Sequence, residues 1–269
     1  MKKSIPASAR REDLALLPDS AHNLSVEEVK LLWSFLHGDI MIGETRKLLR
    51  QHWGLCARHA WGHAVVEIEL WQAGAGRRAG HQPFDVGILY EDLLETMIRD
   101  LSASRARSRM WLLTGRGICP VCKDLHGYSI PGLPGGYASS NSIALTDETN
   151  QMTHMRAWVA ETRALWRVCP ACAASPVAGE GGPPLCRPHI LERGSLDDQE
   201  TRRLLTDLTE TRQLLLALID SMTQTGRPAT PAADASWIHA LGWFNGWALP
   251  LALANTDPGT EQRIPDDRR

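Results

Sequence analysis

The sequence has no strong excess of charge of either sign. Among its 269 residues, 29 Lys and Arg stand against 31 Asp and Glu, which gives a formal net charge of −2. A chain with so little net charge has no overall electrostatic attraction for nucleic acid. Nucleic-acid binding would therefore depend on a local group of basic residues.

Features of exported proteins and of β-proteins are also missing. The basic start at Met1 is followed by Arg10-Arg11-Glu12-Asp13, where a signal peptide would have an apolar segment. We therefore expect a cytoplasmic protein in a reducing compartment, where paired cysteines bind metals more often than they form disulfides. No run of alternating apolar and polar residues is long enough to indicate a strand.

No cysteine is left over to act as an isolated nucleophile. All six lie in Cys-x-x-Cys or Cys-x-x-His pairs, and the complete set of predicted metal ligands is Cys56, His59, Cys119, Cys122, Cys169, Cys172, Cys186 and His189. Six thiolates and two imidazoles make two sets of four, the number and type of ligand that tetrahedral Zn²⁺ prefers. The pattern predicts about two zinc ions per chain rather than an iron–sulfur cluster, which usually has four thiolate ligands.

Two groupings of these pairs are open. In the simpler one the last four ligands, Cys169 to His189, hold one ion across a Gly- and Pro-rich segment, and the first four hold the other. In the alternative, the first Cys-x-x-His pair joins Cys169 and Cys172, while Cys119 and Cys122 join the last pair. Either grouping fills four positions with protein atoms, which indicates structural zinc, because catalytic zinc keeps one position open.

Helical periodicity predicts a mostly α fold, a multi-helix domain with two zinc-knuckle sites and few or no strands. Ser25 and Glu28 have the capping-box spacing at the start of the first helix. Ile42, Leu48 and Leu49 are expected to face inward from the second. The predicted helices cover residues 25–38, 39–53, 57–72, 83–102, 146–167, 195–224 and 234–249, the sixth capped by Ser195.

The composition along the chain predicts five regions. A flexible arm is expected first and a disordered tail last, with two helical regions between them and a Gly- and Pro-rich loop separating those two. The boundaries are 1–22 for the arm, 23–126 for the helical region with the first Cys-x-x-His pair and C-P-V-C, 127–145 for the loop, 146–254 for the helical region with C-P-A-C and C-R-P-H, and 255–269 for the tail.

The order of these motifs resembles that of an uncharacterised prokaryotic family of helical, cysteine-rich proteins. In that family C-P-x-C knuckles alternate with G-x-C-x-x-H helix starts, and a helix reading roughly G-x-x-I-L-Y-E-D-L-L lies between them. The resemblance covers about residues 30–195, and the matching segments are 54–59, 87–94, 119–122, 169–172 and 185–189. A C-P-x-C knuckle before the first C-x-x-H pair is absent here. The resemblance implies metal binding and a helical fold, and it implies no activity.

One predicted helix suggests an alternative, enzymatic function. Cys56, His59, His63 and Glu67 are spaced three, four and four residues apart and share one helix face. They could form an open metalloenzyme site with a general base, or His63 and Glu67 could orient His59. The simpler interpretation is that His63 belongs to a packed face and that Glu67 is solvated.

A second alternative is a zinc protein that binds nucleic acid. Arg105, Arg107 and Arg109 precede Trp111, and Arg202-Arg203 forms another basic pair. Basic groups beside an aromatic ring can bind phosphates and stack a base. Because the net charge is near zero, a solvated helix face is favoured over nucleic-acid binding.

A further pair of charged residues, Glu91 and Glu95, lies one helical turn apart. A solvated helix face is favoured there over a pair of catalytic carboxylates.

The last predicted helix is apolar nearly all round. Its aromatic residues are Trp237, Trp243, Phe244 and Trp247, and it is interrupted by His239, Asn245 and Pro250, which argues against a membrane span. Gly242 and Gly246 would allow another helix to approach closely. Such a surface is either the centre of a core or an interface. We favour a zinc-binding helical scaffold that acts through a protein partner or through self-association at this helix.

Overall fold

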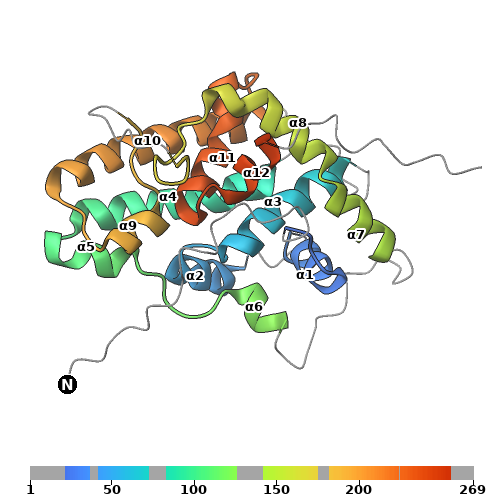
Figure 1. Cartoon of the computed structure of the whole chain (residues 1–269), viewed down its shortest axis with the longest axis horizontal. Helices are drawn as coiled ribbons and strands as arrows, with labels where there is room; N and C mark the ends of the chain where they lie inside the picture. The colour runs from blue at the N-terminus through green and yellow to red at the C-terminus, as the bar shows by residue number, and fades with distance from the viewer. Residues whose placement is uncertain are drawn as a thin grey trace, which may run out of the picture.

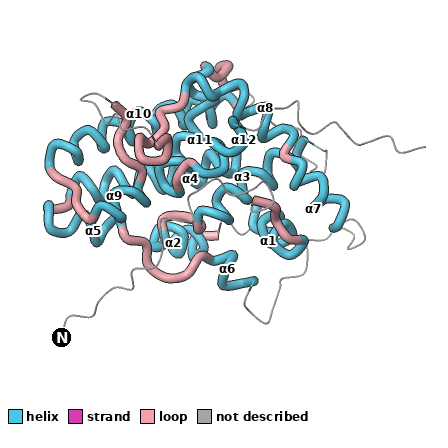
Figure 2. Tube along the Cα trace, viewed as in Figure 1, coloured by secondary structure: helices cyan, strands magenta, loops and turns pink. Residues whose placement is uncertain are grey.

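The structure is a computed structural model and describes residues 22–36, 42–72, 83–125, 142–174, 182–223 and 225–255. Within these ranges the regular structure is helical throughout, from α1 to α12 with one short 3-10 helix, η5, and contains no strand (Figures 1 and 2). The predicted mostly α fold is therefore confirmed. In the same ranges, none of the helices has the length and apolarity that crossing a membrane requires.

Three long helices form one side of the molecule. Helix α4 (Phe84–Ala103) packs along α10 (Asp198–Ser221), and α11 (Pro231–Asn245) packs against both. Leu204, Leu208 and Leu215 are buried on the inner face of α10, as their spacing predicts.

Helix α3 (Ala57–Gln72) joins this group to a second one. It contacts α1 (Val26–Leu36), α7 (Ser142–Gln151) and α8 (Thr153–Thr162), and it also contacts α4 and α11. Figure 1 shows α3 running across the middle of the molecule toward α7. The buried apolar side chains of both groups form one continuous core.

The predicted capping box at the start of α1 is confirmed. The backbone N–H of Ser25 donates to the Glu28 carboxylate at 2.7 Å, and the N–H of Glu28 donates to Ser25 Oγ at 3.2 Å. Helix α1 ends at Leu36, and Gly38, predicted to close it, lies outside the described residues. The observed bounds of α3 and α4 also agree with the predicted 57–72 and 83–102.

Helix α2 (Gly43–His52) corrects part of the prediction for the second helix. Leu49 is buried, but Ile42 and Leu48 are each 51% exposed rather than inward-facing. The reason is that α2 packs against α4 through one narrow face. The helix ends at Trp53, whose φ of 60° places it in the left-handed region and turns the chain toward Cys56.

Helix α5 (Ala106–Leu113) was not predicted. Its apolar residues lie close together in the sequence. Arg105, the N-cap residue, and Arg107 and Arg109 in its first half occupy alternate positions and hide the helical period. Arg109 is buried and pairs with Asp198 at 2.6 Å, so the structure separates it from the two exposed arginines of the run.

The prediction of one continuous helix over residues 146–167 is wrong. The chain forms α7 and α8 with a break at Met152, which has φ 53° and ψ 33°, and then η5 (Arg163–Leu165). Glu69 explains the break, because its carboxylate accepts from the backbone N–H groups of His154 and Met155 at the start of α8. This cap comes from a distant segment and has no local sequence signal.

The start predicted for the next helix is also wrong. A short helix, α9 (Arg187–Arg193), ends at Gly194 with φ 74°, and α10 then starts with Asp197 as its N-cap rather than Ser195. Asp197 and Glu200 form a capping box, in which each side chain accepts from the other residue's backbone N–H.

The apolar C-terminal helix is two helices, and its aromatic residues belong to the core. Gly246, at φ 82°, ends α11 before α12 (Ala248–Asn255). The four aromatic residues predicted to form an interface are at most 5% exposed, namely Trp237, Trp243, Phe244 and Trp247. Their apolar area is covered within the chain by α4, α8, α9, η5 and neighbouring helices. These side chains therefore form the centre of a core, one of the two possibilities that the sequence left open, and partner binding or self-association stays a prediction.

The predicted arm, loop and tail fall mainly outside the described residues. Of the arm, only residue 22 is described, and of the tail, only residue 255. Residues 142–145 of the predicted loop belong to α7, and the rest of that loop lies outside the described ranges. The division into two helical regions stays a prediction.

Candidate metal centres

Cluster one consists of Cys56, His59, Cys119 and Cys122, and two helix starts bring it together. Cys56 immediately precedes α3, so that His59 lies in the first turn. Cys119 immediately precedes α6 (Pro120–Leu125), so that Cys122 lies in the first turn of that helix. A ligand just before a helix and another in its first turn point toward the same side, which explains the three-residue spacing.

Cluster two consists of Cys169, Cys172, Cys186 and His189 and repeats half of this arrangement. Cys186 is the N-cap residue of α9, and His189 lies in its first turn. Cys169 and Cys172 come from a turn in which the N–H of Ala173 donates to the carbonyl of Cys169 at 3.0 Å. The grouping is the local one of the two that the sequence leaves open.

The distances inside both clusters correspond to the edges of a tetrahedron. In cluster one, His59 Nδ1 lies 3.3, 3.6 and 3.3 Å from the sulfurs of Cys56, Cys119 and Cys122, and the Cys56 and Cys122 sulfurs are 3.8 Å apart. Zinc–sulfur and zinc–nitrogen bonds of about 2.3 and 2.0 Å at tetrahedral angles require sulfur–sulfur edges of about 3.8 Å and sulfur–nitrogen edges of about 3.5 Å. The observed atoms occupy such corners without a disulfide.

Cluster two has the same dimensions. His189 Nδ1 lies 3.5, 3.4 and 3.1 Å from the sulfurs of Cys169, Cys172 and Cys186, and the latter two sulfurs are 3.7 Å apart. Both clusters therefore offer three sulfurs and one Nδ1 atom around a common centre. Each could hold one metal ion.

Crowding of the ligand groups separates their pKa values. A hydrogen bond with Cys56 lowers the pKa of Cys119 to about 3, and the same interaction raises the pKa of Cys56. In cluster two, hydrogen bonds with Cys172 and Cys186 lower the pKa of Cys169. Each cluster without metal thus favours one thiolate and retains protons on its other thiols. A metal ion that binds all three sulfurs must displace those protons, so metal affinity rises with pH.

Glu28 supports cluster one, although its position in the sequence does not mark it as a site residue. Its Oε1 atom accepts from Nε2 of His59 at 3.1 Å, which leaves Nδ1 free to bind a metal. Glu28 also accepts from Arg58 at 2.6 and 2.8 Å. Although burial raises its pKa, the hydrogen bonds from His59 and Arg58 lower it well below the usual range for Glu. The capping-box motif was the available signal, because it fixes Glu28 at the start of α1.

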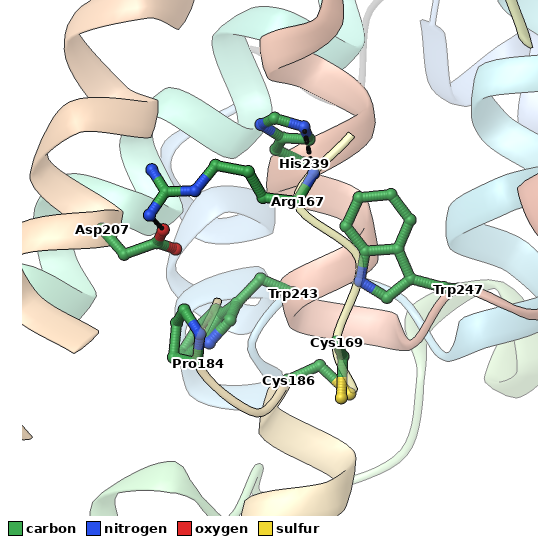
Figure 3. Close-up of a pocket in the computed structure, with 8 residues that line it drawn as sticks. All are labelled: Arg167, Cys169, Pro184, Cys186, Asp207, His239, Trp243 and Trp247. Carbon is green, nitrogen blue, oxygen red and sulfur yellow. Dashed lines mark hydrogen bonds and ion pairs between the residues drawn. The ribbon is translucent and has the colours of Figure 1, made fainter. Parts of the chain in front are cut away.

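Cluster two has weaker support from its surroundings. Glu192 Oε2 lies 4.0 Å from His189 Nε2, and the Glu192 side chain is 62% exposed. A cavity of about 10 Å³, at the lower limit for one water molecule, lies beside the cluster. Figure 3 shows the side chains that line it. It is lined by Arg167, Cys169, Pro184, Cys186, Asp207, His239, Trp243 and Trp247.

Polar groups hold one wall of this cavity in place. Arg167 pairs with Asp207 at 2.7 Å, and the backbone N–H of Arg167 donates to Nε2 of His239 at 3.1 Å (Figure 3). Burial lowers the pKa of His239 to about 4, so the imidazole accepts in its neutral form. The indole of Trp247 packs against His239 with ring centroids 5.8 Å apart.

His63 and Glu67 do not join either cluster, although they share a helix face with His59. His63 is fully buried, packs edge-on against Phe35, and has no hydrogen-bond partner for either ring nitrogen among the described residues. Burial lowers its pKa to about 3. It belongs to a packed face, and it is in neither of the two metal-binding groups found in the described part of the chain.

Glu67 is buried rather than solvated, which corrects the simpler interpretation. Its carboxylate oxygens accept from the backbone N–H groups of Asp85 and Val86 at 2.8 and 2.9 Å. Glu67 therefore caps α4 from α3, and burial, together with the charge of Asp85, raises its pKa to about 8. The predicted open site at Cys56, His59, His63 and Glu67 is not formed.

The other charged groups considered from the sequence have structural partners or lie in solvent. Glu91 and Glu95 both pair with Arg212 of α10, at 2.6 and 3.3 Å, and so join α4 to α10. Arg202 and Arg203 are exposed.

A larger hollow, of about 660 Å³, shares no residue with either cluster. It opens to solvent between the segment before α1, the α7–α8 break and α12, and its wall carries the oppositely charged Asp147 and Arg156. Neither cluster uses it, and none of the predicted site residues lines it.

Comparison with known proteins adds no relative. The chain matches no protein-family model, no curated protein and no solved structure. The resemblance to a prokaryotic family of cysteine-rich proteins stays a prediction.

Proposed function

We propose that the chain is a cytoplasmic helical scaffold that holds one structural Zn²⁺ in each cluster and acts by binding a protein partner. The observation that carries the zinc assignment is the pair of tetrahedral sets, each with three sulfurs and one Nδ1 atom. Soft thiolates with an imidazole suit Zn²⁺ and disfavour Mg²⁺ or Ca²⁺, which prefer oxygen. An iron–sulfur cluster usually has four thiolates, and each set here has three.

The positions of the two sets support a structural role. In cluster one, Cys56 and His59 would join the start of α3 to the start of α6, which is only six residues long. In cluster two, Cys169 and Cys172 would join an irregular turn to α9, which has seven residues. Helices this short are unstable by themselves. A bound zinc ion would supply the cross-link that holds them in place.

A closed ligand set argues against the metalloenzyme alternative. All four tetrahedral corners in each cluster are protein atoms, whereas a catalytic zinc needs a corner for water or substrate. His63, the predicted further member of an open site, is fully buried and belongs to neither cluster. A helical protein whose zinc sites are both closed can still act by presenting a surface to a partner protein.

Elemental analysis of protein purified without added metal tests the zinc assignment. We expect about two zinc ions per chain. Cys172→Ser should remove one of them and lower the melting temperature strongly, because structural zinc contributes on the order of 10 kcal/mol of binding energy coupled to folding. Glu192→Gln, at an exposed position beside cluster two, is the control and should keep both ions. Metal-free protein, or melting that chelation leaves unchanged, would reject the proposal.

A further inference from the structure

Exposed aromatic and apolar side chains, which were expected at the C-terminal helix, are found on a different surface. It lies over α2, α5 and the segment from 114 to 119 that links α5 to Cys119. We call it the α2–α5 face and define it by Leu48, Arg105, Arg107, Trp111, Arg116 and Ile118.

Backbone contacts hold the parts of this face together. The N–H of Arg116 donates to the carbonyl of Gln51 in α2 at 2.8 Å, and the indole N–H of Trp53 donates to the carbonyl of Leu112 in α5 at 2.8 Å. A Cβ atom on Gly115 would lie 2.6 Å from the carbonyl oxygen of His52, so the segment is pressed against the end of α2. Figure 2 shows this loop passing beside α2 on its way to α6.

Large apolar side chains are exposed on this face. Ile118 is 71% exposed, Trp111 62% and Leu48 51%. The Arg116 guanidinium stacks on the indole of Trp111 at 4.0 Å from the ring centroid. Exposed tryptophan and arginine side chains are the types that dominate binding energy at protein interfaces. The segments that carry these side chains adjoin, because Arg116 contacts Trp111, bonds to Gln51 one turn from Leu48, and lies two residues before Ile118. A single exposed apolar residue needs no explanation, but several on adjoining segments indicate an interaction site.

The face also has a local positive charge that the whole chain lacks. Residues 42–53 and 104–125 contain eight Lys and Arg but only two Asp and Glu, in a chain with a net charge of −2. Some of these cations are neutralised, since Arg50 pairs with Asp92 and Arg109 with Asp198. Arg105 and Arg107 are exposed and make no ion pair within the described part of the chain. Their charge remains available to a partner.

We propose that the α2–α5 face binds an acidic segment of a partner protein that carries apolar side chains between its carboxylates. The carboxylates would pair with Arg105 and Arg107, and the apolar side chains would cover Trp111, Leu48 and Ile118. A nucleic acid would satisfy the arginines but would leave the two aliphatic side chains in water, because its backbone is charged. This inference names the partner of the proposed scaffold and rests on that function.

The test measures fluorescence anisotropy with the full-length, metal-loaded chain. The probe is a short labelled peptide that alternates Glu or Asp with Leu or Phe, and the comparison peptide has Ser in place of every apolar residue. We expect the first peptide to bind about tenfold more tightly than the second. Trp111→Ala and Arg107→Glu should each weaken its binding about tenfold or more, and added salt should weaken it further.

Two control variants change similar residues outside the face. Ile143→Ser alters an apolar side chain of α7 that is 68% exposed, and Arg202→Glu alters an exposed arginine of α10. Both should bind the peptide as the parent chain does. Because Trp111 and Arg107 are exposed, their variants should keep the parent melting temperature and zinc content, which confirms that any loss of binding is local.

Several outcomes would overturn the inference. One is peptide binding that is absent, or that Trp111→Ala leaves unchanged. A second is tighter binding of an oligothymidylate of about 20 nucleotides than of the peptide, which would assign the face to nucleic acid. A third is a doubled mass by light scattering that Trp111→Ala abolishes, which would assign it to a second copy. If zinc is present but the peptide does not bind, this inference fails while the zinc assignment stands.

Discussion

Nε2 of His59 lies 3.1 Å from Oε1 of Glu28, and this hydrogen bond joins cluster one to the first turn of α1. The same carboxylate receives the backbone N–H of Ser25 in the capping box, so one side chain fixes both the helix start and the imidazole. Among the described residues, cluster two has no equally close carboxylate, since Glu192 Oε2 lies 4.0 Å from His189 Nε2. The two clusters thus differ in how firmly the surrounding protein orients the imidazole.

Glu28→Gln should therefore weaken metal binding at cluster one. An amide accepts a weaker hydrogen bond than a carboxylate, and loss of such a partner typically lowers metal affinity about 10- to 100-fold. Competition of the loaded protein with a chromophoric chelator measures the change. Glu27→Gln alters the exposed neighbouring residue of α1 and should bind both ions as the parent does. Equal affinities for the two variants would mean that Glu28 does not orient His59.

His63→Leu should leave the metal content unchanged and raise stability by about 1 kcal/mol. The buried ring has two nitrogens without partners among the described residues, and an unsatisfied buried polar group costs about 1–3 kcal/mol. Loss of the edge-on contact with Phe35 offsets part of the gain. Urea unfolding of zinc-loaded protein at neutral pH measures the difference. A loss of zinc or a large fall in stability would give His63 a role in the site.

The raised pKa of Glu67 predicts that the free energy of unfolding falls as pH rises. Its pKa is about 8 in the folded chain against 4.5 for the free side chain, so the folded state binds the extra proton between these values. Stability linked to this proton is complete below pH 4.5 and is lost as pH rises through 8. Glu67→Gln cannot ionise, so its stability relative to the parent should increase from pH 6 to pH 8, a window inside about 4.5–8. Glu161→Gln, at an exposed position, should follow the parent. If the stability of Glu67→Gln changes with pH in parallel with that of the parent, the raised pKa of Glu67 is rejected.

The sequence predicts what local spacing determines and misses what distant contacts determine. Cys56 and His59 point toward one centre because their spacing alone orients them at a helix start, and the two clusters follow from four such local pairs. The break at Met152 depends on Glu69, which lies on another helix. No window around residue 152 contains that information.

The same limit explains why the sequence left open whether the C-terminal aromatic residues form a core or an interface. The hydrophobicity of α11 is a property of its sequence, but whether it faces a core or a partner depends on which helices surround it. Here α4, α8, α9, α10 and η5 contact α11 and bury it. Conversely, Trp111 and Ile118 have no periodic pattern that would mark them, and their exposure is known only from the fold.

The contact between Gly242 and Trp247 leads to a prediction that separates core packing from self-association. A Cβ atom on Gly242 would lie 2.7 Å from Cδ2 of the Trp247 indole, and no real Cβ atom comes that close. The indole cannot move freely, because it packs against Trp166 and His239 and lines the cavity beside Cys169. Added volume at such a site costs about 1–3 kcal/mol.

Gly242→Ala should therefore lower the melting temperature and speed the loss of zinc from cluster two to a chelator. Gly43→Ala is the matched control, because a Cβ atom there meets nothing within 4 Å and alanine favours the helix that begins at this residue. It should leave the melting temperature equal or higher, with metal retention unchanged. If Gly242 served a helix of a second copy instead, Gly242→Ala would reduce the mass measured by light scattering while the monomer kept its melting temperature. That result would contradict the intramolecular role, which requires the opposite pattern.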